Sequence, residues 1–265
     1  MSLLVMAGAA RADDQPFINI YTTDIETEGG KELEQKVIWA TQKPGQSYNS
    51  ILSRTEVEWG VTDDFQVSLS GNYEWERIRL HAPSGANTTE REFSVSGEAI
   101  YRFLNVYFDP VGLAVYLEPS FGDKSRELEA KILLQKNFFN DDLRIAANIN
   151  FENTWERDSG NWNKGSAIEF FLGAAYNVTP EFSVGMEFNN ENEFEGLIGG
   201  AHPASNVYYL GPTLHYEGHP FKVTLGAQAQ LPWANDASHA PGTVRDGFHV
   251  DAERYRLGIQ ISTDI

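Results

Sequence analysis

Apolar and polar residues alternate one by one along most of this 265-residue chain. Between Phe65 and Glu76 the odd-numbered positions are apolar apart from Gly71, and the even-numbered positions are all polar. Successive side chains of a strand point to opposite faces, so the pattern predicts a strand with one apolar and one polar face. The same alternation recurs in residues 93–103, 143–152 and 221–231, which predicts a chain built of strands.

Twelve such segments follow one another, separated by turns rich in Asp, Asn, Gly and Pro. They are residues 32–41, 48–60, 65–79, 90–103, 111–121, 127–138, 143–155, 165–177, 181–193, 205–217, 221–232 and 250–264. Several exceed the usual strand length of roughly five or six residues and suit tilted strands that cross a bilayer. The predicted fold class is all-β, a single 12-stranded antiparallel up-and-down transmembrane β-barrel.

The connections are expected to fall into two classes. Short turns are predicted at residues 62–64, 140–142, 177–180 and 217–220, with a slightly longer one at 104–110. Longer polar loops are predicted at residues 42–47, 80–89, 122–126, 156–164, 194–204 and 233–249. This alternation is typical of a barrel with short periplasmic turns, longer external loops and both termini in the periplasm. A soluble β-sandwich would explain the alternating side chains but not the segregation of the connections by length.

Composition excludes several other classes of protein. The net charge of -18 disfavours a nucleic-acid partner, and the absence of cysteine excludes a disulfide scaffold, a thiolate zinc site and a cysteine nucleophile. The mean hydropathy is -0.39, and no run approaches the roughly 18 apolar residues that a spanning helix needs. A barrel is compatible with these values because its apolar residues are interleaved with polar ones.

The start of the chain predicts export. Residues 1–12 are small or apolar apart from Ser2 and Arg11, and they end in Ala10-Arg11-Ala12. This pattern predicts the remainder of a secretory signal peptide that is cleaved after Ala12. Residues 13–30 are then a short N-terminal periplasmic segment, and residues 31–265 form the transmembrane β-barrel.

Aromatic residues gather toward the ends of the predicted strands, mostly on the apolar face. This placement predicts aromatic girdles at the two membrane–water interfaces. The residues concerned are Trp39, Trp59, Trp75, Tyr101, Phe103, Phe138, Phe151, Tyr176, Phe182, Phe188 and Tyr255.

Three segments carry a resemblance to a known group. Residues 58–67 (EWGVTDDFQV) and 175–185 (AYNVTPEFSVG) are similar to a strand–turn–strand pattern of Gram-negative outer-membrane barrels, and residues 209–214 (YLGPTL) resemble one of their later strands. The chain most resembles the poorly characterised barrels of the meta-pathway-of-phenol-degradation type. The resemblance implies the outer membrane of a Gram-negative bacterium, with its lipid, lipopolysaccharide and barrel-assembly machinery as partners. One departure is the last residue, Ile265, where such barrels usually have an aromatic residue.

The polar face of the predicted strands should line the barrel lumen. The acidic residues expected there are Glu56, Glu58, Glu74, Glu76, Glu98, Glu118, Glu129, Glu152, Glu169 and Glu187. The basic residues expected there are Arg54, Arg102, Lys131, Arg144, Arg254 and Arg256. An acidic lumen of this kind predicts a passive channel for small solutes with a preference for cations. The alternative is that these charges pair and fill a closed barrel, which then acts as a structural or interaction protein through its extracellular loops.

An enzyme is not expected from this sequence. It has no Gly-x-Ser-x-Gly elbow and no His-Glu-x-x-His pair, and most of its six histidines fall in predicted loops. A lipid-modifying outer-membrane enzyme is a third hypothesis, with His215 and either Ser205 or Thr213 as candidate residues. No cofactor or metal site is predicted, since no stretch has the spacing of a known calcium loop.

Overall fold

The computed structural model describes residues 15–44, 46–80, 87–158, 160–200, 202–234 and 243–265. The predicted signal peptide, residues 1–12, lies outside this part of the chain. The strands are β1 (Lys31–Lys43), β2 (Gln46–Thr62), β3 (Phe65–Leu80), β4 (Asn87–Leu104), β5 (Gly112–Gly122), β6 (Ser125–Phe138), β7 (Leu143–Asp158), β8 (Asn161–Asn177), β9 (Phe182–Glu195), β10 (His202–Glu217), β11 (Lys222–Gln230), β12 (Val244–Arg245), β13 (Phe248–His249) and β14 (Tyr255–Asp264).

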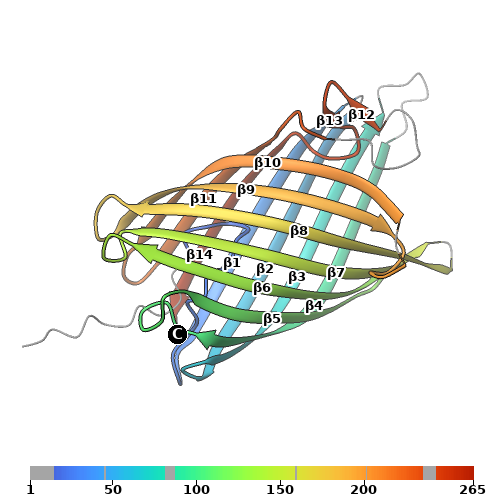
Figure 1. The fold of residues 1–265 in the computed structure, drawn as a ribbon. Helices are drawn as coiled ribbons and strands as arrows, with labels where there is room; N and C mark the ends of the chain where they lie inside the picture. Colours follow the sequence, from blue (N-terminus) through green and yellow to red (C-terminus); the bar gives the residue numbers. More distant parts are fainter. Residues whose placement is uncertain (1–14, 45, 81–86, 159, 201, 235–242) are drawn as a thin grey trace, which may run out of the picture.

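Twelve of these strands form one closed barrel (Figure 1). Each pairs antiparallel with the strand before and after it, and β14 closes the barrel by pairing with both β11 and β1. Strands β12 and β13 form a two-residue hairpin within the connection between β11 and β14. The prediction of an all-β, 12-stranded up-and-down barrel is confirmed.

The alternating pattern determines which side chains face outward. Leu69 and Phe93 are 69% and 59% exposed on the outer surface, whereas Glu56 and Glu98, on the inward face of neighbouring strands, are 2% and 5% exposed. An apolar exterior is suited to lipid, and a closed barrel pairs the backbone groups that lipid could not satisfy. Among the described residues no helix is long and apolar enough to cross a membrane.

The two ends of the barrel differ. Strand β1 starts and strand β14 finishes at one end, which we call the termini end; the other, where β12 and β13 lie, is the loop end (Figure 1). The five connections at the termini end are those predicted to be short. At the loop end the prediction was wrong for residues 42–47, 122–126 and 156–164, because the strands run on and leave two residues between them. The predicted loops at 80–89, 194–204 and 233–249 lie partly outside the described residues.

Aromatic side chains ring the termini end on the outer surface. Tyr101 packs against Phe103 with ring centroids 4.9 Å apart, and Phe182 lies 4.8 Å from Tyr216. At the loop end Tyr208 packs edge-on against Trp233 at 5.9 Å. Aromatic side chains at both rims match the girdles of membrane barrels.

Candidate functional site: the barrel lumen

Residues 15–30, which we call the N-terminal segment, run inside the barrel at the termini end (Figure 1). Phe17, Ile20 and Ile25 of this segment are only 1–2% exposed. Phe17 and Ile20 pack with Ala146 on β7 and with residues of β8, while Ile25 joins a second cluster with residues of β4, β5 and β6. The segment therefore fills this half of the lumen, a position that the sequence did not predict.

Amide side chains of the wall hold the backbone of this segment. The N–H of Tyr21 donates to Oδ1 of Asn148 at 2.8 Å, and Nδ2 of Asn148 donates back to the Tyr21 carbonyl at 2.8 Å. Two residues on, the N–H of Thr23 donates to Oε1 of Gln135 at 2.7 Å. These bonds satisfy buried backbone groups that have no strand partner.

A carboxylate anchors the start of the segment, and another amide anchors its later part. Glu187 accepts hydrogen bonds from the N–H of Ile18, from the N–H of Asn19 at 3.2 Å and from Nδ2 of Asn19 at 3.0 Å. The N–H of Glu26 donates to Oε1 of Gln66 at 2.6 Å. Glu187 therefore holds two consecutive backbone N–H groups and one side chain at the start of the segment.

Glycines in the wall make room for the side chains of the segment. A Cβ atom at Gly226 would lie 2.6 Å from Cγ1 of Ile18, and one at Gly258 would lie 2.7 Å from its Cγ2. A Cβ atom at Gly173 would lie 2.7 Å from Cε1 of Phe17. These three strand positions accept the segment only because they carry no side chain.

The contacts of the segment extend around the barrel wall. Its hydrogen bonds reach strands β2, β3, β4, β6, β7, β9 and β11. A void beside it, lined by Phe17, Tyr21, Glu34 and Gln66 among others, has a volume of about 10 Å³. That space is about enough for one water molecule, so the segment packs closely against this part of the wall.

An ion-pair network fills the middle of the lumen. Arg54 on β2 contacts Glu56 at 2.7 Å, Glu118 at 2.8 Å and Glu98 at 3.3 Å. These carboxylates come from β2, β5 and β4, so one guanidinium links three strands. The OH of Tyr21 donates to Glu98 at 3.5 Å, which connects the network to the N-terminal segment.

The other predicted lumen residues divide between the two halves. In the termini half, Glu58 accepts a hydrogen bond from Gln66, and Glu187 anchors the segment. Two arginines of this half also contact the segment. Arg144 lies 3.8 Å from Asp24, and Arg102 donates to the carbonyl of Thr23 and to Asp64 in the turn after β2. In the loop half, Glu74, Glu129, Lys131, Glu152 and Glu169 line cavities, Glu76 accepts from Tyr48, Arg256 pairs with Glu191 and Glu253, and Arg254 stacks on the ring of Phe248.

The loop half contains two cavities. The first has a volume of about 430 Å³, has Ile18, Asn19 and Tyr21 of the N-terminal segment among its lining residues, and is lined by seven glutamates against three basic residues. The second has a volume of about 390 Å³ and is lined by five glutamates and one lysine. Glu156 and Glu169 line both. The loop half is therefore an acidic vestibule above the N-terminal segment.

The residues of the hypothetical enzyme site all lie on β10, and Ser205 is far from the other two. Nδ1 of His215 is 2.8 Å from Oγ1 of Thr224, in the half that holds the N-terminal segment. Ser205 lies ten residues earlier on the same strand, about 33 Å away at the rise of an extended chain, and donates to Glu193. Oγ1 of Thr213 has no hydrogen-bond partner among the described residues. The structure brings none of these groups into a nucleophile–base pair.

Glu187 was among the lumen residues that the sequence predicted, but the sequence did not single out the amides of the wall that hold the N-terminal segment. The signal is visible in retrospect: Gln66, Gln135 and Asn148 are amides on the inward face of the termini half, where the lumen glycines also lie. The segment itself carries several large apolar residues, which is unusual for a stretch exposed to the periplasm.

Comparison with solved structures identifies the same architecture elsewhere. The "COG4313 outer membrane channel" of Pseudomonas putida F1 superposes with a TM-score of 0.63 at 10% identity, covering 92% of this chain and 98% of that one. The NanC porin gives 0.55 at 11% identity, covering 89% and 100%. The β-domain of the Bordetella autotransporter BrkA gives 0.55 at 10% identity, covering 90% and 100%.

These likenesses establish an outer-membrane β-barrel fold. Because the three proteins include a channel, a porin and an autotransporter domain, the fold does not by itself assign a function. The narrower resemblance to the meta-pathway-of-phenol-degradation barrels stays a prediction. A comparison by sequence with curated proteins finds no match. Residues 9–264 match the family described as "Family of unknown function (DUF6662)", and the chain, a 12-stranded outer-membrane-type barrel, belongs to that family.

Proposed function

We propose that this barrel is a passive outer-membrane channel for small solutes, with a preference for cations, and that the N-terminal segment closes it at the termini end. The vestibule of the loop half admits solutes, and withdrawal of the segment opens the remaining path. In the usual orientation of such barrels the termini end faces the periplasm. The segment would then regulate passage from the periplasmic side.

The acidic vestibule is the observation that carries this proposal. Carboxylates outnumber basic groups in the lining of both cavities. A cleft lined by one sign of charge between low-dielectric walls raises the local concentration of counter-ions. Rings of acidic side chains select cations in channels by the same effect.

Reconstitution in a planar bilayer tests the channel directly. The purified protein is inserted in a bilayer with a KCl gradient, and the reversal potential is measured. We expect conductance steps that come and go as the segment moves, and a reversal potential of the sign that potassium permeation gives. Absence of conductance, or a reversal potential of the opposite sign, would contradict the proposal.

The alternative of a closed barrel that acts through its loops draws support from the ion pairs of Arg54 and from the N-terminal segment. Both features fill the termini half and the middle of the lumen, whereas the vestibule is hollow. The bilayer measurement separates the two functions, because a closed barrel gives no current. We propose no catalytic activity, in keeping with the separation of His215 from Ser205.

A further inference from the structure

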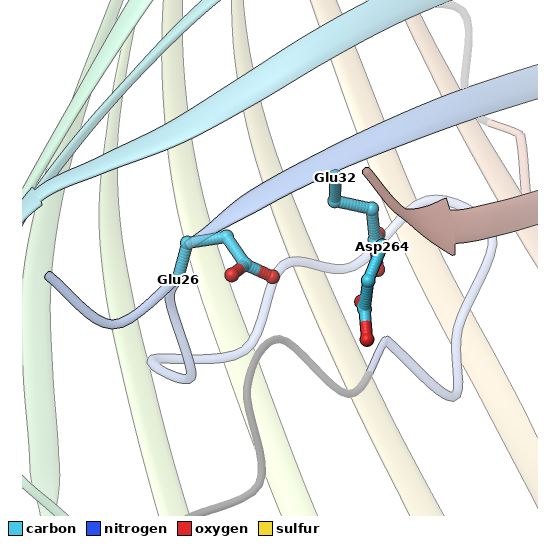
Figure 2. Close-up of side chains that lie close together, drawn as sticks. All are labelled: Glu26, Glu32 and Asp264. Atoms are coloured by element: carbon cyan, nitrogen blue, oxygen red, sulfur yellow. The ribbon is translucent and has the colours of Figure 1, made fainter. Parts of the chain in front are cut away.

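Three carboxylates meet where the N-terminal segment joins the wall (Figure 2). Glu26 belongs to the segment, Glu32 lies at the start of β1, and Asp264 lies at the end of β14. One carboxylate oxygen of each lies within 4.8 Å of those of the other two. The cluster therefore joins the N-terminal segment to the two strands that close the barrel.

These carboxylates have too little positive charge around them. Among the described residues, Lys222 contacts Glu32 and lies 3.7 Å from Asp264, so one ammonium faces the cluster of three carboxylates. Glu26 is 2% exposed, and its Oε1 has no hydrogen-bond partner among the described residues. An unpaired buried carboxylate is costly. Burial, and then the charge of Glu32, raises the pKa of Glu26 to about 7.

The neighbouring group of Glu32, Glu34 and Glu58 is different. Its ligand oxygens are equally close together, but Glu58 accepts a hydrogen bond from Gln66 at 2.6 Å and Glu34 lies 3.8 Å from Lys36. Its carboxylates are satisfied by other side chains. The Glu26 group is the one with a buried oxygen that lacks a partner.

We propose that Glu26, Glu32 and Asp264 bind a calcium ion that fastens the N-terminal segment to strands β1 and β14. Carboxylate oxygens are the ligands that calcium prefers, at about 2.3–2.6 Å, so ligands on opposite sides of the ion are about 4.6–5.2 Å apart. Asp264 is exposed and gives the ion a route from solvent. A divalent cation would also neutralise the two negative charges that Lys222 leaves.

Isothermal titration calorimetry measures calcium binding by the whole chain, which is refolded in zwitterionic detergent without lipopolysaccharide. We expect CaCl2 to bind with a stoichiometry of one, and more tightly than MgCl2. Glu26→Gln and Asp264→Asn should each weaken calcium binding at least tenfold. Glu28→Gln is the matched control, since Glu28 is an exposed carboxylate of the same segment outside the cluster. Lys222→Gln should bind calcium more tightly, because it removes the competing ammonium.

Each outcome bears on the proposal. No calcium binding by the parent chain, tighter binding of magnesium, or equal effects of Glu26→Gln and Glu28→Gln would overturn it. Heat-modifiable migration on a gel verifies that each variant is a folded barrel, so a loss of binding is not a loss of fold. The measurement does not depend on conductance, so the calcium site stands or falls separately from the channel.

Discussion

At the scale of single residues, the lumen wall is specialised to hold a peptide backbone. Asn148 both donates to and accepts from the backbone of Tyr21, as a neighbouring strand would. Gln135 and Gln66 accept from N–H groups further along the segment. An amide side chain can donate to a carbonyl and accept from an N–H at the same time, which an ionised carboxylate cannot do. The amides therefore allow an irregular segment to be buried inside a barrel.

Replacement of Glu187 by alanine should loosen the start of the segment. The variant loses three hydrogen bonds to a charged acceptor, and bonds of that kind contribute about 1.5–3 kcal/mol each. We expect faster hydrogen exchange at the amides of Ile18 and Asn19, measured by mass spectrometry. Asn189→Ala is the control, since Asn189 is buried two residues along the same strand without a partner among the described residues. Equal exchange in the two variants would argue against anchoring by Glu187.

At the scale of elements, the strands could be predicted from the sequence, but the position of the N-terminal segment inside the barrel could not. The period of two is set by each strand's own residues, so the alternation around residues 65–76 was enough to place β3. Most strands were predicted too short at the loop end, because polar residues such as those of 156–158 continue a strand when neighbours pair with it. The last two were predicted too long there, since β11 ends at residue 230 rather than 232 and β14 begins at 255 rather than 250. The N-terminal segment has no period, and its position depends on side chains of many strands at once.

A disulfide should lock the segment in place. The chain has no cysteine, and a Cβ atom at position 226 would lie 3.4 Å from the Cβ of Ile18. This separation is close to the range of about 3.5–4.5 Å found in disulfides. We expect the oxidised Ile18→Cys/Gly226→Cys variant to show no conductance steps in a planar bilayer, and dithiothreitol to restore them.

The two single-cysteine variants control for the substitutions themselves. They should conduct alike with and without dithiothreitol. An oxidised double variant that conducts as well as its reduced form would mean that the path does not run through the space held by the segment.

At the scale of the whole molecule, the charge of -18 is divided between the outer rims and the lumen. Within the lumen, one guanidinium, that of Arg54, pairs with three carboxylates in the middle, and the acidic residues also outnumber the basic ones in the lining of the vestibule. The sequence predicted an acidic lumen, but not which carboxylates pair with Arg54 and which line the vestibule, because this depends on the tilt and register of the strands.

Selectivity should therefore reside in the vestibule. Glu156→Gln/Glu193→Gln removes two vestibule charges and keeps the side-chain shapes. The ratio of potassium to chloride permeability, obtained from the reversal potential, should fall toward one. Asp142→Asn/Glu181→Gln removes two charges from exposed turns at the termini end and should leave the ratio unchanged. Equal shifts in both double variants would mean that total charge, rather than vestibule charge, sets selectivity.

The position of the N-terminal segment also fixes an order of events during biogenesis. The segment is made first, yet its binding partners lie on strands from β2 to β11, and Asp264 beside it is the second-last residue of the chain. The segment cannot bind in its place until nearly every strand has been added to the barrel. The N-terminal segment, which is synthesised before every strand, is therefore expected to be the last part of a new barrel to take its place.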